Sequence, residues 1–70
     1  MRYAVVIENV KRNFSAYVPD LPGCVAVGDT LPETRRQIRE AIEFHLDGMR
    51  ADGTPIPEPV TRVIYVEVET

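Results

Sequence analysis

Histidine and cysteine, two residue types that often carry out catalysis, occur only once each in this 70-residue sequence. The only histidine is His45, and a histidine acting as a general base needs a nucleophile or water beside it and access to a substrate. The sequence has no Gly-x-Ser-x-Gly turn, no phosphate-binding loop and no His-Glu-x-x-His pair. A packing histidine is therefore the favoured interpretation, and a small hydrolase centred on His45 is the alternative.

The sequence gives as little support for redox or metal chemistry as it does for catalysis by His45. Cys24 is the only cysteine, so it has no partner for an internal disulfide, and its default interpretation is a small apolar residue of a strand. Asp20 and Asp29 lie on either side of Cys24 and carry oxygen ligands, but turn and helix-cap chemistry already accounts for both carboxylates. We therefore expect no catalytic residue, metal site or cofactor.

The charge balance favours a protein partner. The net charge is −3 and the isoelectric point is about 5.0, which argues against a basic nucleic-acid surface and suits a basic protein. Three arginines, Arg35, Arg36 and Arg39, form a short basic cluster. Because Arg36 and Arg39 are each followed four residues later by a glutamate, we expect a solvated face with paired charges.

The sequence also indicates where the protein acts. A single cysteine is typical of a reducing compartment. No apolar run approaches the length of a membrane span, and the first residues, MRYAVVIE, have the pattern of a strand and not of a signal peptide. We therefore expect a cytoplasmic protein without a membrane anchor.

Alternating apolar residues predict four short strands, and a 3.6-residue period predicts one helix. The strands are expected at residues 2–8, 14–18, 24–28 and 61–69, and the helix at residues 31–51. The element order β-β-β-α-β predicts an α+β fold of two layers, in which one long helix covers one face of an antiparallel sheet. The uncovered face still carries apolar residues, which points to a partner, either another copy or a different protein.

The stretch from Tyr17 to Asp29, YVPDLPGCVAVGD, organises this arrangement. Pro19 and Pro22 fix their φ angles, and Gly23 can adopt a positive φ. The Asp20 side chain can hydrogen-bond the backbone of the turn. We therefore expect a stiff corner between two strands.

A helix start follows the corner. Thr30 is a good N-cap residue, and Glu33 stands three residues later, which is the pattern of a capping box. The helix is expected to stop before Gly53. The connector TPIPEP at residues 54–59 is extended, and the sequence leaves open whether the last strand pairs within its own chain or with a neighbour.

One aromatic residue departs from the apolar side of the helix. Phe44 lies about 120° from Ile38, which is the centre of the apolar stripe. The residues on its side are Gln37, Ala41, Gly48 and Ala51. A large aromatic beside small residues predicts an interface where another chain approaches closely, whereas the alternative is a lone exposed aromatic.

Several segments together resemble the HicB family of bacterial and archaeal antitoxins. They are YAVVIE, then FSAYVPDLPGCVAVGDT, then EAIEFHLDGM and then DGTPIPEP. The resemblance covers nearly the whole chain, and its most specific parts are PDLPGC, the acidic-Thr helix start and the DG-x-PIPEP connector.

The resemblance implies a partial ribonuclease H-like fold and a single HicB-like domain over residues 1–70. HicB-like proteins bind and inhibit HicA toxins, which are small basic proteins that cleave mRNA, and they do so by occlusion. Many members also carry a C-terminal DNA-binding domain; this sequence ends at Thr70, so the short form without direct nucleic-acid binding is expected. The alternative function is a stand-alone cytosolic homo-oligomer, a dimer or tetramer, without a cognate toxin.

Overall fold

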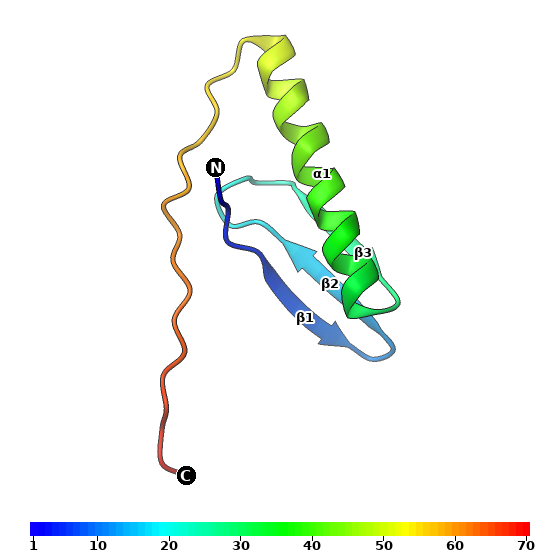
Figure 1. The fold of residues 1–70 in the computed structure, drawn as a ribbon, viewed down its shortest axis with the longest axis vertical. Helices are drawn as coiled ribbons and strands as arrows, with labels where there is room; N and C mark the ends of the chain where they lie inside the picture. The colour runs from blue at the N-terminus through cyan, green and yellow to red at the C-terminus, as the bar shows by residue number, and fades with distance from the viewer.

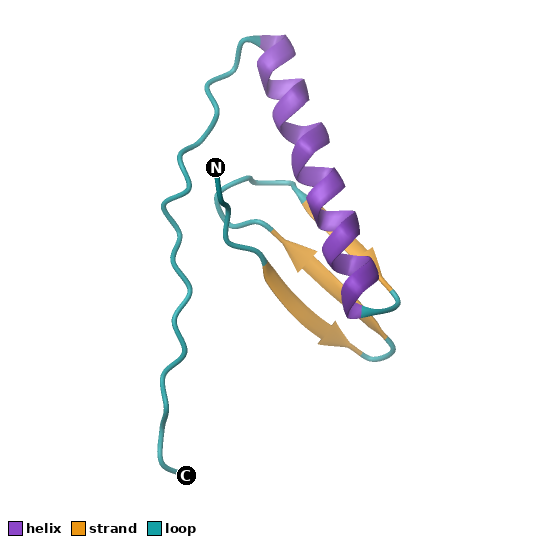
Figure 2. Cartoon of the chain, viewed as in Figure 1, coloured by secondary structure: helices purple, strands orange, loops and turns teal.

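The computed structural model describes all residues from 1 to 70, and it confirms the α+β class (Figure 1). Three antiparallel strands form one sheet in the order β1-β2-β3. The strands are β1 (Val6–Val10), β2 (Asn13–Tyr17) and β3 (Val25–Gly28), and α1 (Leu31–Asp52) is the one helix. Figure 2 shows α1 crossing one face of the sheet, while residues 53–70 run down one side of the molecule.

The strand register sorts the side chains between the two faces. Ile7 is paired with Ala16, and Ala16 is paired with Ala26; all three pack in or against the core under the helix. The first strand begins at Val6, later than the sequence predicts. In this register Pro19 would stand opposite residue 4, and a proline has no N–H to continue the ladder.

The corner after β2 is closed by backbone hydrogen bonds and contributes to the core. The Leu21 N–H donates to the Val18 carbonyl at 3.1 Å, and the Cys24 N–H donates to the Leu21 carbonyl at 3.0 Å. Gly23 has a φ of 85°, as the sequence predicts. The turn places Leu21 inside the protein with no exposed surface. The Pro/Gly corner is therefore part of the core as well as a link between strands.

The helix starts and stops where the sequence predicts, with one extra residue at its end. The Glu33 N–H donates to Thr30 Oγ1 at 3.2 Å, which is half of the expected capping box. The Glu33 carboxylate makes no hydrogen bond in return; instead, the Thr34 hydroxyl donates to the Thr30 carbonyl at 2.8 Å. Gly53 ends the helix in the left-handed conformation, with a φ of 71°.

The hydrophobic core is small and lies between the helix and one end of the sheet. Its buried members are Ala16, Val18, Leu21, Cys24 and Ile38. A ring of half-buried apolar residues packs around them, and Tyr3, Val5, Ile7, Ala26, Ala41, Ile42 and Leu46 belong to it. Much of the apolar surface of this chain is therefore only partly removed from water.

The expected last strand is extended but has no partner strand in its own chain. Residues 54–70 belong to no helix or sheet. The segment is tied to the body at two places: the Tyr3 hydroxyl donates to the Pro57 carbonyl at 2.6 Å, and Asp20 binds Thr61. Beyond Thr61 the chain turns away from β1, so no ladder forms.

The hydrogen-bond partner predicted for the Asp20 side chain, the backbone of its own turn, is wrong. Both carboxylate oxygens are used by the C-terminal segment: Oδ2 accepts from the Thr61 N–H at 3.1 Å, and Oδ1 accepts from the Thr61 hydroxyl at 2.8 Å. The turn closes through its backbone alone, which leaves the carboxylate free for this long-range contact.

The hydropathy of α1 does not fit a membrane-spanning helix. Although α1 has 22 residues, charged side chains interrupt it throughout, and no helix of the chain is long and apolar enough to cross a membrane.

Candidate protein-docking surfaces

The structure exposes apolar side chains on three separate surfaces. We call them the helix stripe (Gln37, Ala41, Phe44 and Gly48 of α1), the open sheet face (Val6, Tyr17, Val25 and Val27) and the C-terminal arm (residues 62–70). A fourth feature is a groove between α1 and the segment that leads into β1.

The helix stripe contains the residues that the sequence predicts as an interface. Their spacing of four, three and four residues places them along one side of α1. The Phe44 side chain is 83% exposed, so α1 packs against the sheet without it. A Cβ added at Gly48 would meet no atom within 4 Å, which leaves the helix backbone open to close approach there. Ala41 is half-buried because it also packs against the core.

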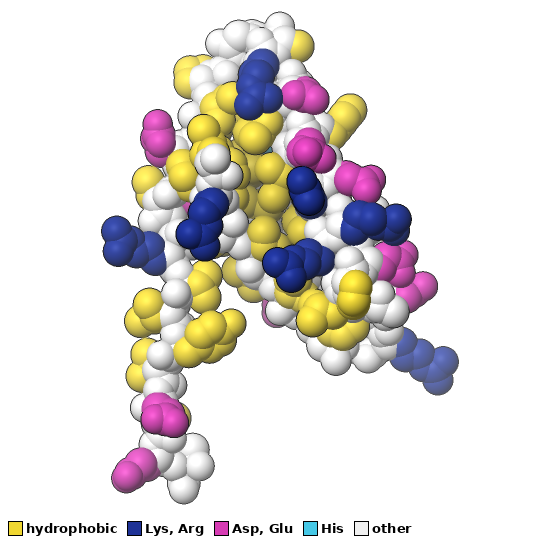
Figure 3. Space-filling view, in the orientation of Figure 1, with side chains coloured by type: hydrophobic (Ala, Val, Ile, Leu, Met, Phe, Trp, Pro, Cys, Tyr) yellow, Lys and Arg dark blue, Asp and Glu magenta, His cyan; other side chains and the backbone are white.

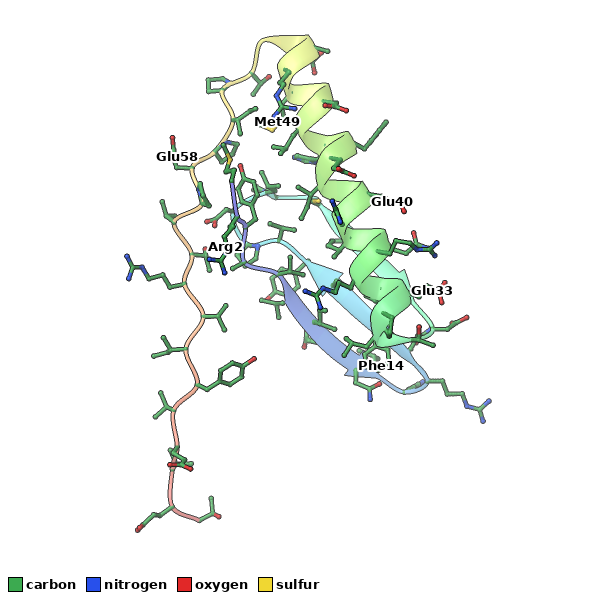
Figure 4. The ribbon with its side chains drawn as sticks, in the orientation of Figure 1. Arg2, Phe14, Glu33, Glu40, Met49 and Glu58 are labelled. Atoms are coloured by element: carbon green, nitrogen blue, oxygen red, sulfur yellow. The ribbon has the colours of Figure 1, made fainter.

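Acidic residues flank the helix stripe. Glu33, Glu40 and Asp47 recur every seven residues, and their wheel positions lie within roughly 60° of Phe44. Asp47 pairs with Arg50 at 3.1 Å, whereas neither glutamate is in a salt bridge. Glu33 and Glu40 project from the same side of the helix (Figure 4). The stripe therefore combines an aromatic anchor with an acidic rim, which suits a basic protein surface.

The open sheet face is the side of the sheet that α1 does not cover. Val6 is paired with Tyr17, and Tyr17 is paired with Val25, so these three side chains adjoin one another. Val25 and Val27 are 62% and 59% exposed. An apolar uncovered face was expected from the presence of a single helix. The residues that lie on this face depend on the strand register, which the sequence does not define.

The groove beside the helix has a volume of about 1040 Å³. Half-buried Tyr3, Val5 and Ile7 line one wall, Ile42 and Leu46 line the other, and Ile38 is also among its lining residues. Arg35, Arg36 and Arg39 line the same groove. Figure 3 shows apolar side chains in this hollow and basic side chains beside it.

The predicted ion pairs of these arginines are wrong. The only salt bridge in the chain joins Arg50 to Asp47, so Arg36 and Arg39 are not paired with the glutamates that follow them. Exposed pairs of this kind gain only about 0.2–0.5 kcal/mol, too little to hold two long side chains together. Glu43 also lines the groove, but the three arginines outnumber it, so the groove keeps an excess of positive charge.

The side chains that could carry out chemistry do not form a common site. His45 is half-buried on α1, and its ring has no hydrogen-bond partner in the chain. Cys24 is 3% exposed, and burial raises the pKa of its thiol, so the reactive thiolate is disfavoured. No three of the His, Cys, Asp and Glu side chains come together in a way that could hold a metal ion. What the arrangement offers is surface for binding.

Comparison with protein families gives the context of these surfaces. The model of the HicB_like antitoxin of bacterial toxin-antitoxin systems matches residues 3–68. The chain belongs to this family. It is 43% identical over 58 residues to a 14.9 kDa protein of Haemophilus phage HP1, covering 83% of this chain and 44% of that protein. It is 31% identical over 67 residues to a UPF0150 protein of Thermoplasma acidophilum, covering 94% and 97% of the two chains.

The solved structures show the same relationship. A chain of a HicA3 and HicB3 toxin-antitoxin complex superimposes with a TM-score of 0.73 at 28% identity, covering 86% of this HicB-like chain and 70% of that chain. The HicB resemblance and the fold class predicted from the sequence are thereby confirmed. The HicB-like chain spans less than half of the phage relative and 65% of a UPF0150 protein of Helicobacter pylori, to which it is 45% identical over 47 residues.

Proposed function

We propose that this HicB-like chain is a cytoplasmic antitoxin module that binds a HicA-type mRNA-cleaving toxin and neutralises it by occlusion. The observation that carries the proposal is the likeness, at a TM-score of 0.73, to the antitoxin of a HicA3 and HicB3 complex. Residues 1–70 act as one HicB-like domain in this proposal, with no cofactor and without direct contact to nucleic acid.

The helix stripe is the surface we assign to the toxin. HicA toxins are basic, as the family resemblance implies, and the stripe has unpaired Glu33 and Glu40 on its flank. Phe44 supplies an exposed aromatic of the kind that anchors protein interfaces, and Gly48 lets a partner approach the helix backbone. The groove, with three unpaired arginines, is the less suitable side for a basic partner.

The proposed role is non-catalytic. His45 has neither a nucleophile nor a carboxylate within hydrogen-bonding distance, so the side chain has no partner to activate or to orient it. Membership of an antitoxin family agrees with this assignment. Occlusion needs only a tight and correctly placed contact with the toxin.

The test is co-purification with the HicA-type product of the adjacent gene, followed by an RNA-cleavage assay of the toxin. The expected result is a stable complex in which cleavage is lost. Phe44→Glu is expected to weaken the complex by at least about 2 kcal/mol, the threshold for an interface hot spot. Val25→Glu is the matched control, because it places the same charge at a 62% exposed position on the other side of the protein.

The possible outcomes distinguish an error in the proposed function from an error in the assigned interface. If the unaltered chain neither binds the toxin nor stops cleavage, the antitoxin function is wrong. If Val25→Glu abolishes binding and Phe44→Glu does not, the function stands and the open sheet face is the interface.

A second candidate function is a stand-alone homo-oligomer without a toxin, a dimer or tetramer formed through the helix stripe. The exposure of Phe44 favours it as much as it favours a toxin. Light scattering of the purified chain tests this candidate, since Phe44→Ala is expected to reduce the mass to that of a monomer. An unchanged mass would contradict it.

A further inference from the structure

The C-terminal arm is an apolar strand sequence without a strand to pair with. Its large apolar side chains are 55–97% exposed; they are Val63, Ile64, Tyr65, Val66 and Val68. Alternation places Val63, Tyr65, Glu67 and Glu69 on one side of the arm and Ile64, Val66 and Val68 on the other. Both sides of the strand are therefore rich in residues that favour burial in a sheet.

The arm makes the chain much less compact than its length predicts. The radius of gyration is 13.8 Å, whereas a compact domain of this length has about 11 Å. The base of the arm is fixed, because Asp20 holds Thr61 through two hydrogen bonds of 2.8 and 3.1 Å. Residues 62–64 still line a shallow pocket together with residues 2–4, and from there the arm runs away from the sheet and ends beyond it (Figure 1).

The free edge of β1 is a site where a further strand can be added to the sheet. β1 pairs only with β2, so its other edge presents unpaired backbone N–H and carbonyl groups. The groove adjoins that edge, with Val5 and Ile7 on the strand side and Ile42 on the helix side. The nine residues of the arm span up to about 30 Å, enough to run the length of β1 and the groove.

The charges of the arm match those of the groove. An arm parallel to β1 would first pass Leu46 and Ile42 and then Arg39 and Arg35, because α1 runs antiparallel to β1. Tyr65 then faces the apolar half of the groove, while Glu67 and Glu69 face the basic half. These arginines form no salt bridge within their own chain, and Glu43 is the one acidic residue that lines the groove with them.

We propose that two copies of this chain exchange their C-terminal arms, each arm adding a strand to the free β1 edge of the other copy and filling its groove. The contact is reciprocal, as in a two-fold symmetric dimer, and it leaves no edge of β1 unpaired. The proposal does not depend on the toxin, and the dimer is expected in its absence.

The first experiment is light scattering of the chain over a range of concentrations, combined with NMR of a mixture of isotope-labelled and unlabelled copies. A dimer that shows intermolecular contacts between the Tyr65 ring and the Ile42 methyl groups is expected. A monomer at all concentrations would overturn the proposal. So would a dimer whose Tyr65 contacts are all within one copy, or contacts that appear only after toxin is added.

Charge reversal tests the pairing of the arm with the arginines. Glu67→Lys is expected to weaken the dimer at least about tenfold, because the two-fold symmetry turns two attractive contacts into repulsive ones. Arg39→Glu combined with Glu67→Lys is expected to recover most of that loss. Glu58→Lys, which makes the same change of charge at an exposed position in the connector, is the control and should leave the dimer intact.

Glu67→Lys is expected to leave the folding of the body unaffected, since Glu67 makes no hydrogen bond or salt bridge in the single chain. An unchanged dissociation constant for Glu67→Lys would overturn the assigned contact. If Phe44→Ala alone dissolves the dimer, the helix stripe and not the arm joins the copies.

Discussion

The contact between β3 and the start of α1 allows a sharp test of the packing. Gly28 ends β3, and a Cβ built on it would lie 2.5 Å from Thr34 Oγ1, 2.8 Å from the Thr34 backbone nitrogen and 3.0 Å from its Cα. Rotation of the Thr34 hydroxyl can relieve only the first of these contacts. The other two are with backbone, so Gly28→Ala must push the first turn of the helix away from the sheet.

The cost follows from two terms. Overpacking of this kind costs about 1–3 kcal/mol. Displacement of Thr34 also strains its 2.8 Å hydrogen bond to the Thr30 carbonyl, a bond of a type that contributes about 1 kcal/mol. We therefore expect a loss of about 2–4 kcal/mol. Since a domain of 70 residues has a total stability of about 4–10 kcal/mol, this is a large fraction of it.

The assay is urea unfolding at fixed protein concentration, monitored by circular dichroism of the helix. Gly48→Ala is the matched control, because the added Cβ there meets nothing within 4 Å. A loss of less than about 0.5 kcal/mol for Gly28→Ala, the usual size of a neutral surface change, would refute the close packing of β3 against α1.

Three further predictions concern the helix and the core. Gly48→Ala should stabilise the chain by about 0.5–1 kcal/mol in the same urea assay, because alanine is the better helix former, and it should weaken toxin binding in a pull-down if the partner approaches the helix backbone. Thr30→Ala should cost about 1 kcal/mol through the lost cap and Thr30→Ser much less; equal stabilities would contradict the cap. Because burial raises the pKa of Cys24 in the folded chain, its contribution to stability is complete below the ordinary thiol pKa of about 8.5 and decreases as the pH rises above it; unfolding measured between pH 7 and 9.5 should show this decrease, and Cys24→Ala should remove it.

Local signals in the sequence predicted the parts of the fold that depend on near neighbours. The cap at Thr30, the stop before Gly53 and the positive φ of Gly23 each follow from one residue type in a short pattern. The three strands of the sheet were found from alternation, within a few residues at their ends. The first strand starts late because pairing with β2 decides its length, and pairing is not visible in the pattern of β1 itself.

Contacts between distant residues were harder to predict. The carboxylate of Asp20 was assigned to its own turn, but it binds Thr61, 41 residues later. The arginines of α1 were assigned to glutamates one turn away, but they line a groove whose other wall is the segment before β1. In both cases the predicted partner was close in the sequence but its interaction was weak. The tertiary fold places these side chains elsewhere. The interface assigned to Phe44 stays a prediction, although its 83% exposure agrees with it.

The proposed toxin contact and the proposed exchange of arms use different surfaces of this chain. On the helix, Arg35, Arg39 and Ile42 of the groove lie roughly 140–180° from Phe44, so they are on the opposite side of α1. An arm seated in the groove therefore leaves the helix stripe free, and a toxin on the stripe leaves the β1 edge free. An arm received from a second copy also adds to the buried apolar surface, which is small in the single chain, where only seven of 70 residues are buried. Assembly through the arm should accordingly make the chain more resistant to unfolding without changing the proposed affinity for a HicA-type toxin. Glu67→Lys should reduce the resistance to unfolding and preserve that affinity.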